Sequence, residues 1–119
     1  MGERIGASAD VVDAGTGLPF RVQKQGRIYP AFVIRYGGQL YGYLNACAHV
    51  GIRLDSKQNE FFSGDKQYLL CTSHGATYTP DTGACVRGPC SGRGLIPLTV
   101  HEDDGYVIYE DQTYSLVAE

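Results

Sequence analysis

Side chains that bind transition metals occur in the middle of this sequence as two Cys-and-His pairs. One residue separates Cys47 from His49, and two residues separate Cys71 from His74. Because each pair fits within one short loop, two loops could bring two thiolates and two imidazoles to a single site. This ligand set suits a [2Fe-2S] cluster in which two thiolates bind one iron and two neutral imidazoles bind the other. Neutral ligands lower the negative charge of such a cluster and so raise its reduction potential.

Two other metal sites could use part of the same residues. Two Cys and two His also satisfy tetrahedral zinc, but zinc modules of this type usually pair Cys with Cys and His with His. Here each loop supplies one of each. Alternatively, all four cysteines of the chain could be ligands, because Cys85 and Cys90 have the opening spacing of the plant-type ferredoxin motif. No cysteine follows three residues after Cys90, so the sequence favours the mixed-ligand cluster.

The two pairs and their surroundings resemble the ligand boxes of Rieske iron–sulfur proteins. The first box continues as His49-Val50-Gly51 and is followed by Leu54-Asp55. The second continues as His74-Gly75-Ala76-Thr77-Tyr78, followed by Asp81-Thr82-Gly83, and Gly88-Pro89 resembles the proline loop that covers the cluster in that family. The resemblance implies one [2Fe-2S] cluster, ligands Cys47, His49, Cys71 and His74, and neighbouring positions for Tyr78 and Pro89.

The sequence departs from the Rieske proteins of respiratory and photosynthetic complexes. Each box of those proteins carries an extra cysteine, and the two form a disulfide, but Ile52 and Ser73 stand at these positions. A serine that donates a hydrogen bond to a bridging sulfide is replaced by Ala76, whereas the tyrosine two residues later is kept as Tyr78. Hydrogen bonds to cluster sulfur stabilise the reduced state. The resemblance therefore implies a potential in the lower part of the Rieske span of about −150 to +300 mV, with Tyr78 either a hydrogen-bond donor or a core aromatic residue.

No catalytic role is assigned to Cys85 or Cys90, and the third histidine is not expected to be a ligand. In a chain without signs of secretion, cysteines are expected to bind metal or stay reduced. A disulfide between Cys85 and Cys90 is accordingly disfavoured. His101 lies in an expected strand away from the boxes and is interpreted as a surface or packing residue.

The elements that position these boxes are expected to be short strands. The segments between the 16 glycines are short and rich in β-branched and aromatic residues. Strands are predicted at Leu18–Lys24, Arg27–Tyr36, Leu40–Ala46, Leu95–Glu102 and Tyr106–Glu110, with hairpin turns at Gly37-Gly38 and Asp103-Asp104-Gly105. The predicted fold is all-β, a Rieske-like antiparallel sandwich or barrel forming one domain over residues 1–119. Its base strands lie in about 1–46 and 95–119 and share a sheet, and a loop-rich cluster-binding subdomain occupies about 47–94.

Length and charge limit the possible partners. The chain has 119 residues, of which 43% are hydrophobic and 19% charged, as in one globular domain. A net charge of −3 provides no broad field for nucleic acid or an anionic membrane. No signal-peptide core or membrane-spanning run is visible, so a cytoplasmic location is expected.

The ligand count indicates a carrier rather than an enzyme. A Rieske oxygenase also needs an iron bound by two histidines and a carboxylate, and only His101 remains after His49 and His74. A nucleotide-binding glycine fingerprint, which a reductase would need, is absent from the sequence.

The resemblance implies a ferredoxin of the soluble, low-potential branch, similar to ferredoxin components of ring-hydroxylating dioxygenases. It would pass one electron from an NAD(P)H-dependent reductase to a terminal oxygenase or other acceptor, docking transiently at the His49 and His74 tip. Alternatives are a Rieske-like small subunit of a nitrite-type assimilatory reductase and a zinc-stabilised, non-redox binding domain.

Overall fold

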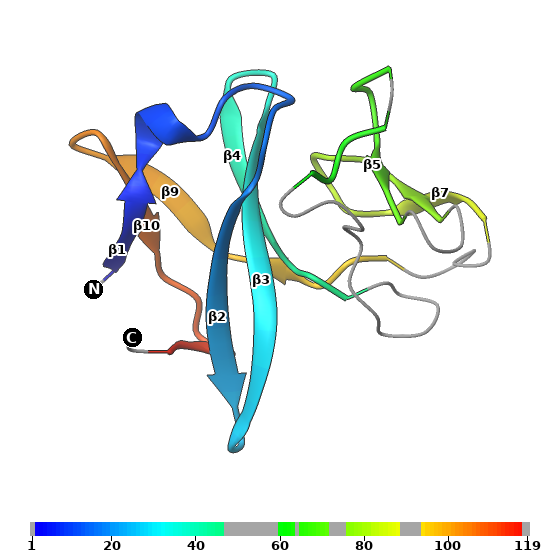
Figure 1. Cartoon of the computed structure of the whole chain (residues 1–119). Coiled ribbons are helices and arrows are strands. Elements are labelled where there is room, and N and C mark those ends of the chain that lie inside the picture. Colours follow the sequence, from blue (N-terminus) through cyan, green and yellow to red (C-terminus); the bar gives the residue numbers. More distant parts are fainter. Residues whose placement is uncertain (1, 47–59, 64, 72–75, 89–93, 118–119) are drawn as a thin grey trace.

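The chain folds almost entirely into antiparallel strands (Figure 1). A computed structural model describes residues 2–46, 60–63, 65–71, 76–88 and 94–117. The strands of the described part are β1 (Glu3–Ala7), β2 (Leu18–Lys24), β3 (Arg27–Tyr36), β4 (Gln39–Leu44), β5 (Leu69–Leu70), β6 (Thr77–Tyr78), β7 (Cys85–Arg87), β8 (Pro97–Leu98), β9 (Val100–Asp103), β10 (Tyr106–Tyr109) and β11 (Ser115–Leu116), with one short 3-10 helix, η1 (Ser8–Asp10). The expected all-β antiparallel architecture is confirmed.

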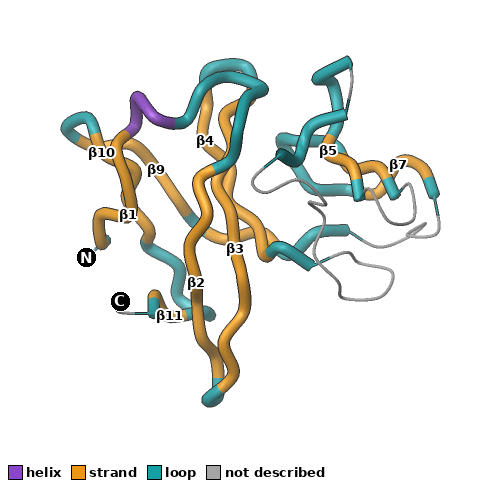
Figure 2. The backbone as a smooth tube through the Cα atoms, in the orientation of Figure 1, coloured by secondary structure: helices purple, strands orange, loops and turns teal. Residues whose placement is uncertain are grey.

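The described strands form three sheets. The largest has the order β11-β2-β3-β4-β8, so strands from both ends of the chain share it, as expected. A second sheet has the order β1-β10-β9, and a third, the small sheet, has the order β5-β6-β7. Figure 2 shows the second sheet on one side of β2, β3 and β4 and the small sheet on the other.

Strand β3 is buried on both faces because two cores meet on it. Its residues Ala31, Phe32, Val33 and Ile34 are all at most 2% exposed. Successive side chains of a strand point to opposite faces. On one face lies the site core, formed by Phe32, Ile34, Tyr43, Phe61, Leu69, Cys71, Ala76, Tyr78 and Leu95. On the other face lies the base core, formed by two adjoining clusters: Val22, Ala31, Leu44, Leu98 and Tyr109, and Val11, Val33 and Val107.

The hairpin turns follow the turn residues of the sequence. Strands β2 and β3 have the predicted bounds, and Gly37 and Gly38 connect β3 to β4 with φ values of 59° and 85°. Asp104 and Gly105 connect β9 to β10 with φ values of 51° and 80°. Two consecutive positive φ angles match the twist of a two-residue hairpin. Strand β4 differs slightly from its prediction, beginning at Gln39 and ending at Leu44.

The single strand predicted over Leu95–Glu102 is wrong. The chain changes sheet at Thr99, because β8 pairs with β4 whereas β9 pairs with β10. Asp111 Oδ1 accepts a hydrogen bond from the Thr99 N–H at 3.0 Å, and the Thr99 carbonyl accepts one from the Glu110 N–H at 3.0 Å. These bonds satisfy the backbone of Thr99 at the crossing, so the chain stays extended while its partner changes.

Arg35 of β3 connects the start of the chain to β9. Its guanidinium donates to the Val11 carbonyl at 2.7 Å and the Ser8 carbonyl at 3.1 Å, and it forms an ion pair with Glu102 at 2.9 Å. The Ser8 hydroxyl also donates to Glu102. The hydrogen bond from Arg35, and then that from Ser8, lower the pKa of Glu102 to about 2.

Replacement of Glu102 by glutamine is expected to remove a pH-dependent part of the stability. A carboxylate whose pKa is lowered in the folded state stabilises fully above its ordinary pKa of 4.5, and this contribution disappears as the pH falls towards about 2. The side chain of Glu102 is 41% exposed, so we expect a difference of only about 0.5–1 kcal/mol at pH 7. Urea unfolding at pH 7 and pH 2.5 measures it. The exposed Asp103→Asn serves as the control, and an E102Q difference that does not shrink at pH 2.5 would contradict this account.

Candidate functional site

Of the four predicted cluster ligands, the described part of the chain contains Cys71. Its side chain is 0% exposed, lies in the site core, and is free of a disulfide. The other predicted site residues Cys47, His49, His74 and Pro89 lie outside the described residues. Correspondingly, within the described ranges no three His, Cys, Asp or Glu side chains gather in a group that could hold a metal ion.

The β5–β6 hairpin positions Cys71. Leu69 pairs with Tyr78 and Leu70 with Thr77, and the Cys71 N–H then donates to the Ala76 carbonyl at 2.8 Å. This hydrogen bond joins the two residues that flank segment 72–75, which carries the second predicted histidine. Cys71 and Ala76 therefore lie side by side at one end of the small sheet.

Phe61 holds Glu60, which follows segment 47–59, at the same end of the small sheet as Cys71. Phe62 forms an antiparallel bridge with Leu69, and the Leu70 N–H donates to the Phe61 carbonyl at 2.8 Å. Because this pairing is antiparallel, Glu60 enters beside the Cys71 end of β5. The ring of Phe61 stacks on that of Phe32 with centroids 3.9 Å apart, which anchors this entry point on β3. Sequence reasoning missed Phe61, although the aromatic pair Phe61-Phe62 directly after the polar residues 55–60 was a usable signal.

Strand β7 ends at this end of the small sheet as well. It is antiparallel to β6, with Thr77 paired to Arg87, so Gly88 follows on the Ala76 side. Gly88 has a φ of 94°, a left-handed conformation in which a side chain would be strained. The predicted loops are the two ligand boxes and the proline loop. The residues that border them lie together at one end of the small sheet: Glu60, Cys71, Ala76 and Gly88. We call this end the candidate cluster site.

Tyr78 and Ala76 are both 0% exposed and belong to the site core. Tyr78 is therefore a core aromatic residue, one of the two interpretations of the sequence. A hydrogen bond from its hydroxyl to a cluster stays a prediction. Ala76 presents only a methyl group at the position where the high-potential proteins carry a serine, so its side chain provides no hydrogen-bond donor there.

The expectation that Cys85 stays reduced is wrong, because Cys85 is disulfide-bonded. Cys71, the other cysteine in the described part of the chain, forms no disulfide. The expectation rested on the redox compartment rather than on geometry, and Cys85 is half-buried against the site core. A sulfur in a disulfide cannot act as a thiolate ligand, so this structure excludes the cluster bound by all four cysteines.

His101 lies on β9 in the second sheet, and its interpretation as a surface residue is confirmed. Its side chain is 46% exposed, and its Nδ1 is 3.7 Å from Glu110 Oε2. The sheet that carries it covers the base core, on the opposite face of β3 from Cys71. His101 therefore does not contribute to the candidate cluster site.

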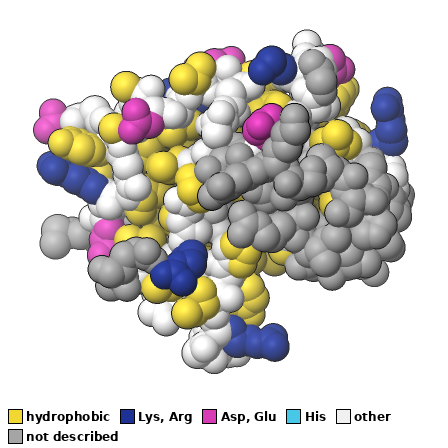
Figure 3. All heavy atoms as spheres, viewed as in Figure 1, with side chains coloured by type: hydrophobic (Ala, Val, Ile, Leu, Met, Phe, Trp, Pro, Cys, Tyr) yellow, Lys and Arg dark blue, Asp and Glu magenta, His cyan; other side chains and the backbone are white. Residues whose placement is uncertain are grey.

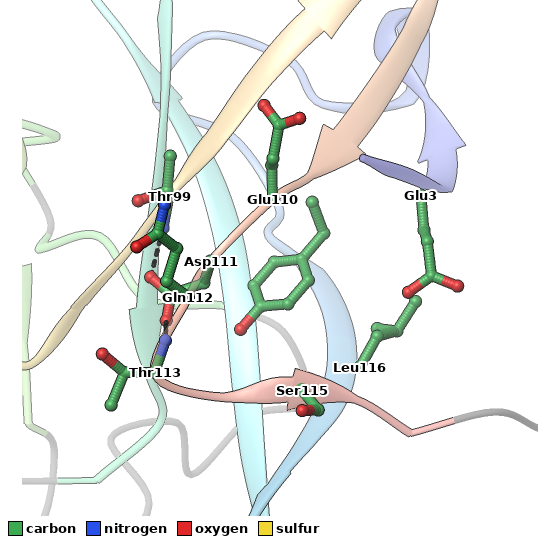
Figure 4. A pocket seen from close by; sticks show the side chains of 9 residues that line it. Glu3, Thr99, Glu110, Asp111, Gln112, Thr113, Ser115 and Leu116 are labelled. Atoms are coloured by element: carbon green, nitrogen blue, oxygen red, sulfur yellow. Dashed lines mark hydrogen bonds between the residues drawn. The ribbon is translucent and has the colours of Figure 1, made fainter. Parts of the chain in front are cut away.

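A separate hollow of about 770 Å³ lies between β10 and β11 (Figure 4). Glu3, Glu110 and Asp111 are among its lining residues, and Cys71, the predicted ligand that the structure describes, is not. Asp111 accepts hydrogen bonds from the N–H groups of Thr99 and Thr113, at 3.0 and 2.9 Å, and so fixes the turn before β11.

Figure 3 shows acidic and basic side chains interspersed over the drawn face of the molecule. No helix in the described ranges is long and apolar enough to cross a membrane.

Solved structures with the same fold include ferredoxins. The ferredoxin of carbazole 1,9a-dioxygenase from Nocardioides aromaticivorans IC177 has a TM-score of 0.69 and 20% identity, over 94% of this chain and 99% of that chain. The Sphingomonas yanoikuyae B1 ferredoxin has a TM-score of 0.68 and 25% identity, over 94% and 99% of the two chains. A chain in a complex of reduced oxygenase and oxidized ferredoxin in carbazole 1,9a-dioxygenase has a TM-score of 0.69 and 24% identity, over 93% and 95%.

The sequence comparisons give the family. No curated protein matches the chain. The sequence profile described as the Rieske [2Fe-2S] domain matches residues 4–115, which include both Cys-and-His pairs and the strands on either side of them. This chain therefore belongs to the Rieske [2Fe-2S] domain family.

Proposed function

We propose that this chain is a one-electron carrier, a Rieske-type ferredoxin without a substrate site of its own, built as a single domain over residues 1–119. In this proposal Cys47 and Cys71 supply thiolates and His49 and His74 supply imidazoles to one [2Fe-2S] cluster. The single observation that carries the assignment is the shared end of the small sheet, where Glu60, Cys71, Ala76 and Gly88 border the three predicted loops. The family match over residues 4–115 supports the cofactor.

The described residues fit this cofactor. Iron–sulfur clusters are held by thiolates, and Cys71, which is not in a disulfide, lies at the candidate cluster site. Its apolar surroundings in the site core exclude water from the sulfur, and the hydrogen bond from its N–H to Ala76 fixes its backbone. When bound, a [2Fe-2S] cluster supplies a one-electron redox couple. Tyr78 and Pro89 are proposed as neighbours that adjust its potential.

The proposed acceptor is a terminal oxygenase. A solved complex of reduced oxygenase and oxidized ferredoxin contains a chain with this fold, and this supports the assignment. The proposed donor is an NAD(P)H-dependent reductase, and the proposed compartment is the cytoplasm. A carrier must release each partner after one transfer, so both would dock through a small interface at the tip that carries His49 and His74. We propose no partnership with nucleic acid or a membrane, in keeping with the net charge of −3.

An EPR spectrum of the dithionite-reduced protein, with iron and acid-labile sulfide analysis of the same sample, tests the proposal. We expect a rhombic signal with the low average g value of a cluster that has two histidine ligands, and equal amounts of iron and sulfide. A colourless, EPR-silent protein that contains zinc would overturn the proposal and favour a non-redox binding domain. Electron transfer from a reductase to an oxygenase through the purified chain then tests the partners.

A further inference from the structure

Tyr43 of β4 connects the largest sheet to the small sheet. Its side chain projects into the site core and is 1% exposed. The hydroxyl donates a hydrogen bond to the Pro80 carbonyl at 2.7 Å. Pro80 is itself buried and lies in the turn between β6 and β7. This bond therefore joins two parts of the chain 37 residues apart across the core that contains Cys71.

The turn that receives this bond is tightly built. The Gly83 N–H donates to the Thr79 carbonyl at 2.8 Å, and the Thr79 N–H donates to the Ala84 carbonyl at 3.0 Å. Gly83 has a φ of 74°, and a Cβ atom at this position would lie 2.7 Å from Tyr43 Cε1. The ring of Tyr43 thus packs directly against the backbone of the turn. Both the hydroxyl and the ring fix the turn on β4.

The turn controls the candidate cluster site because it joins the two strands that lead there. Strand β6 follows Ala76, and β7 leads to Gly88, so both bordering residues depend on where the turn holds the pair. Tyr43 also packs on Phe32, with ring centroids 5.9 Å apart, and Phe32 stacks on Phe61 beside β5. Tyr43 therefore supports the candidate cluster site in two ways. It holds the turn at the opposite end of β6 and β7, and it packs on Phe32 inside the site core.

We propose that Tyr43 is a positioning residue for the [2Fe-2S] cluster, acting by fixing the β6–β7 turn on the largest sheet. The inference rests on the proposed function. Without the hydroxyl, the buried Pro80 carbonyl loses its donor, and the turn must move to reach another. Such a movement shifts the ends of the loops, which weakens hydrogen bonds around the cluster and lowers its reduction potential.

Tyr109 provides a matched control within the same chain. Its hydroxyl also donates to a backbone carbonyl at 2.7 Å, that of Tyr114, and its side chain is 3% exposed. Burial raises the pKa of both tyrosines, so both hydroxyls stay protonated as donors. Tyr109 lies in the base core, on the other face of β3. The two tyrosines therefore differ mainly in which core they serve.

The experiment compares Tyr43→Phe with Tyr109→Phe in the cluster-loaded protein. Both variants should lose stability, because each removes the hydroxyl donor of one backbone carbonyl, that of the buried Pro80 or that of the half-buried Tyr114. Only Tyr43→Phe should lower the midpoint potential, broaden the EPR lines, and release iron to a chelator about tenfold faster. Equal potentials and equal release rates for Tyr43→Phe, Tyr109→Phe and wild type would overturn the inference.

A second pair of variants keeps the test decisive if Tyr43→Phe does not fold. Gly83→Ala places a methyl group against the Tyr43 ring, whereas Gly26→Ala, at a φ of 79° with no atom within 4 Å, imposes similar backbone strain away from any core. Gly83→Ala should lower the potential and Gly26→Ala should not. No difference between them would overturn the inference. A wild-type chain without a cluster would instead show that the proposed function has failed.

Discussion

Replacing Cys71 by serine is expected to abolish cluster binding. Serine offers a hard, protonated oxygen where the proposed site needs a soft thiolate, and iron–sulfur clusters are held chiefly by thiolates. Among the proposed ligands, Cys71 is the one that the structure describes, and its side chain is fully buried. The measurement is iron and sulfide per chain after reconstitution, and we expect essentially complete loss of both.

Cys85→Ser is the control for this variant. Cys85 is disulfide-bonded and borders the same core, so its replacement should leave iron and sulfide at the wild-type level. Circular dichroism separates loss of the cluster from loss of the fold, because the base core does not contain Cys71. A Cys71→Ser protein with a full complement of iron would show that the ligand assignment is wrong.

Truncation of Phe32 to alanine is expected to cause the largest loss of stability. Phe32 is 0% exposed and stacks on Phe61 at 3.9 Å, so its removal leaves a cavity between β3 and the small sheet. Such truncations cost about 3–5 kcal/mol. A domain of this size has a total free energy of unfolding of about 5–15 kcal/mol.

Urea unfolding of Phe32→Ala measures this loss as a lower midpoint at an unchanged slope. Ile28→Ala on the same strand is the control, because Ile28 is 55% exposed and its truncation should change the free energy of unfolding by less than about 0.5 kcal/mol. Equal midpoints for the two variants would mean that the stack on Phe61 contributes nothing to folding, contrary to our account of the site core.

The strands that the sequence predicted well are those with clear turn residues at their ends. Leu18–Lys24 and Arg27–Tyr36 have the predicted bounds because Gln25-Gly26 and Gly37-Gly38 both adopt the positive φ angles of hairpin turns. The turn at Asp104-Gly105 is set in the same way. In these hairpins the local chemistry of the turn determines where each strand stops.

The elements that the sequence did not predict depend on contacts between distant residues. Strands β5, β6, β8 and β11 contain two residues each, which is too short for a period of two to be visible. Strand β1 was not predicted, because its charged and glycine-containing segment resembles a loop until it pairs with β10. The change of sheet at Thr99 depends on Asp111, 12 residues away.

For the candidate cluster site, the sequence indicated the chemistry but not the residues that hold the site in place. The Cys-and-His pairs predicted the Rieske family, which is confirmed, whereas the ligand assignment stays a prediction. The roles of Phe61 and Tyr43 were not visible, because a buried aromatic residue has the same sequence signal whether it fills a core or holds a turn. Only contacts in the folded chain, such as that of the Tyr43 hydroxyl with the Pro80 carbonyl, reveal which role each side chain has.

The burial of β3 on both faces limits how the length of this chain can change during evolution. Inserting or deleting one residue between Ala31 and Ile34 would exchange the faces, sending the small side chains into the space that Phe32 occupies and Phe32 into the base core. Both cores would be disrupted at once. Length changes should instead accumulate at tips such as Gln25-Gly26, where no atom lies within 4 Å of a Cβ placed on Gly26. Related chains can therefore differ widely in their loops while this strand keeps its exact length.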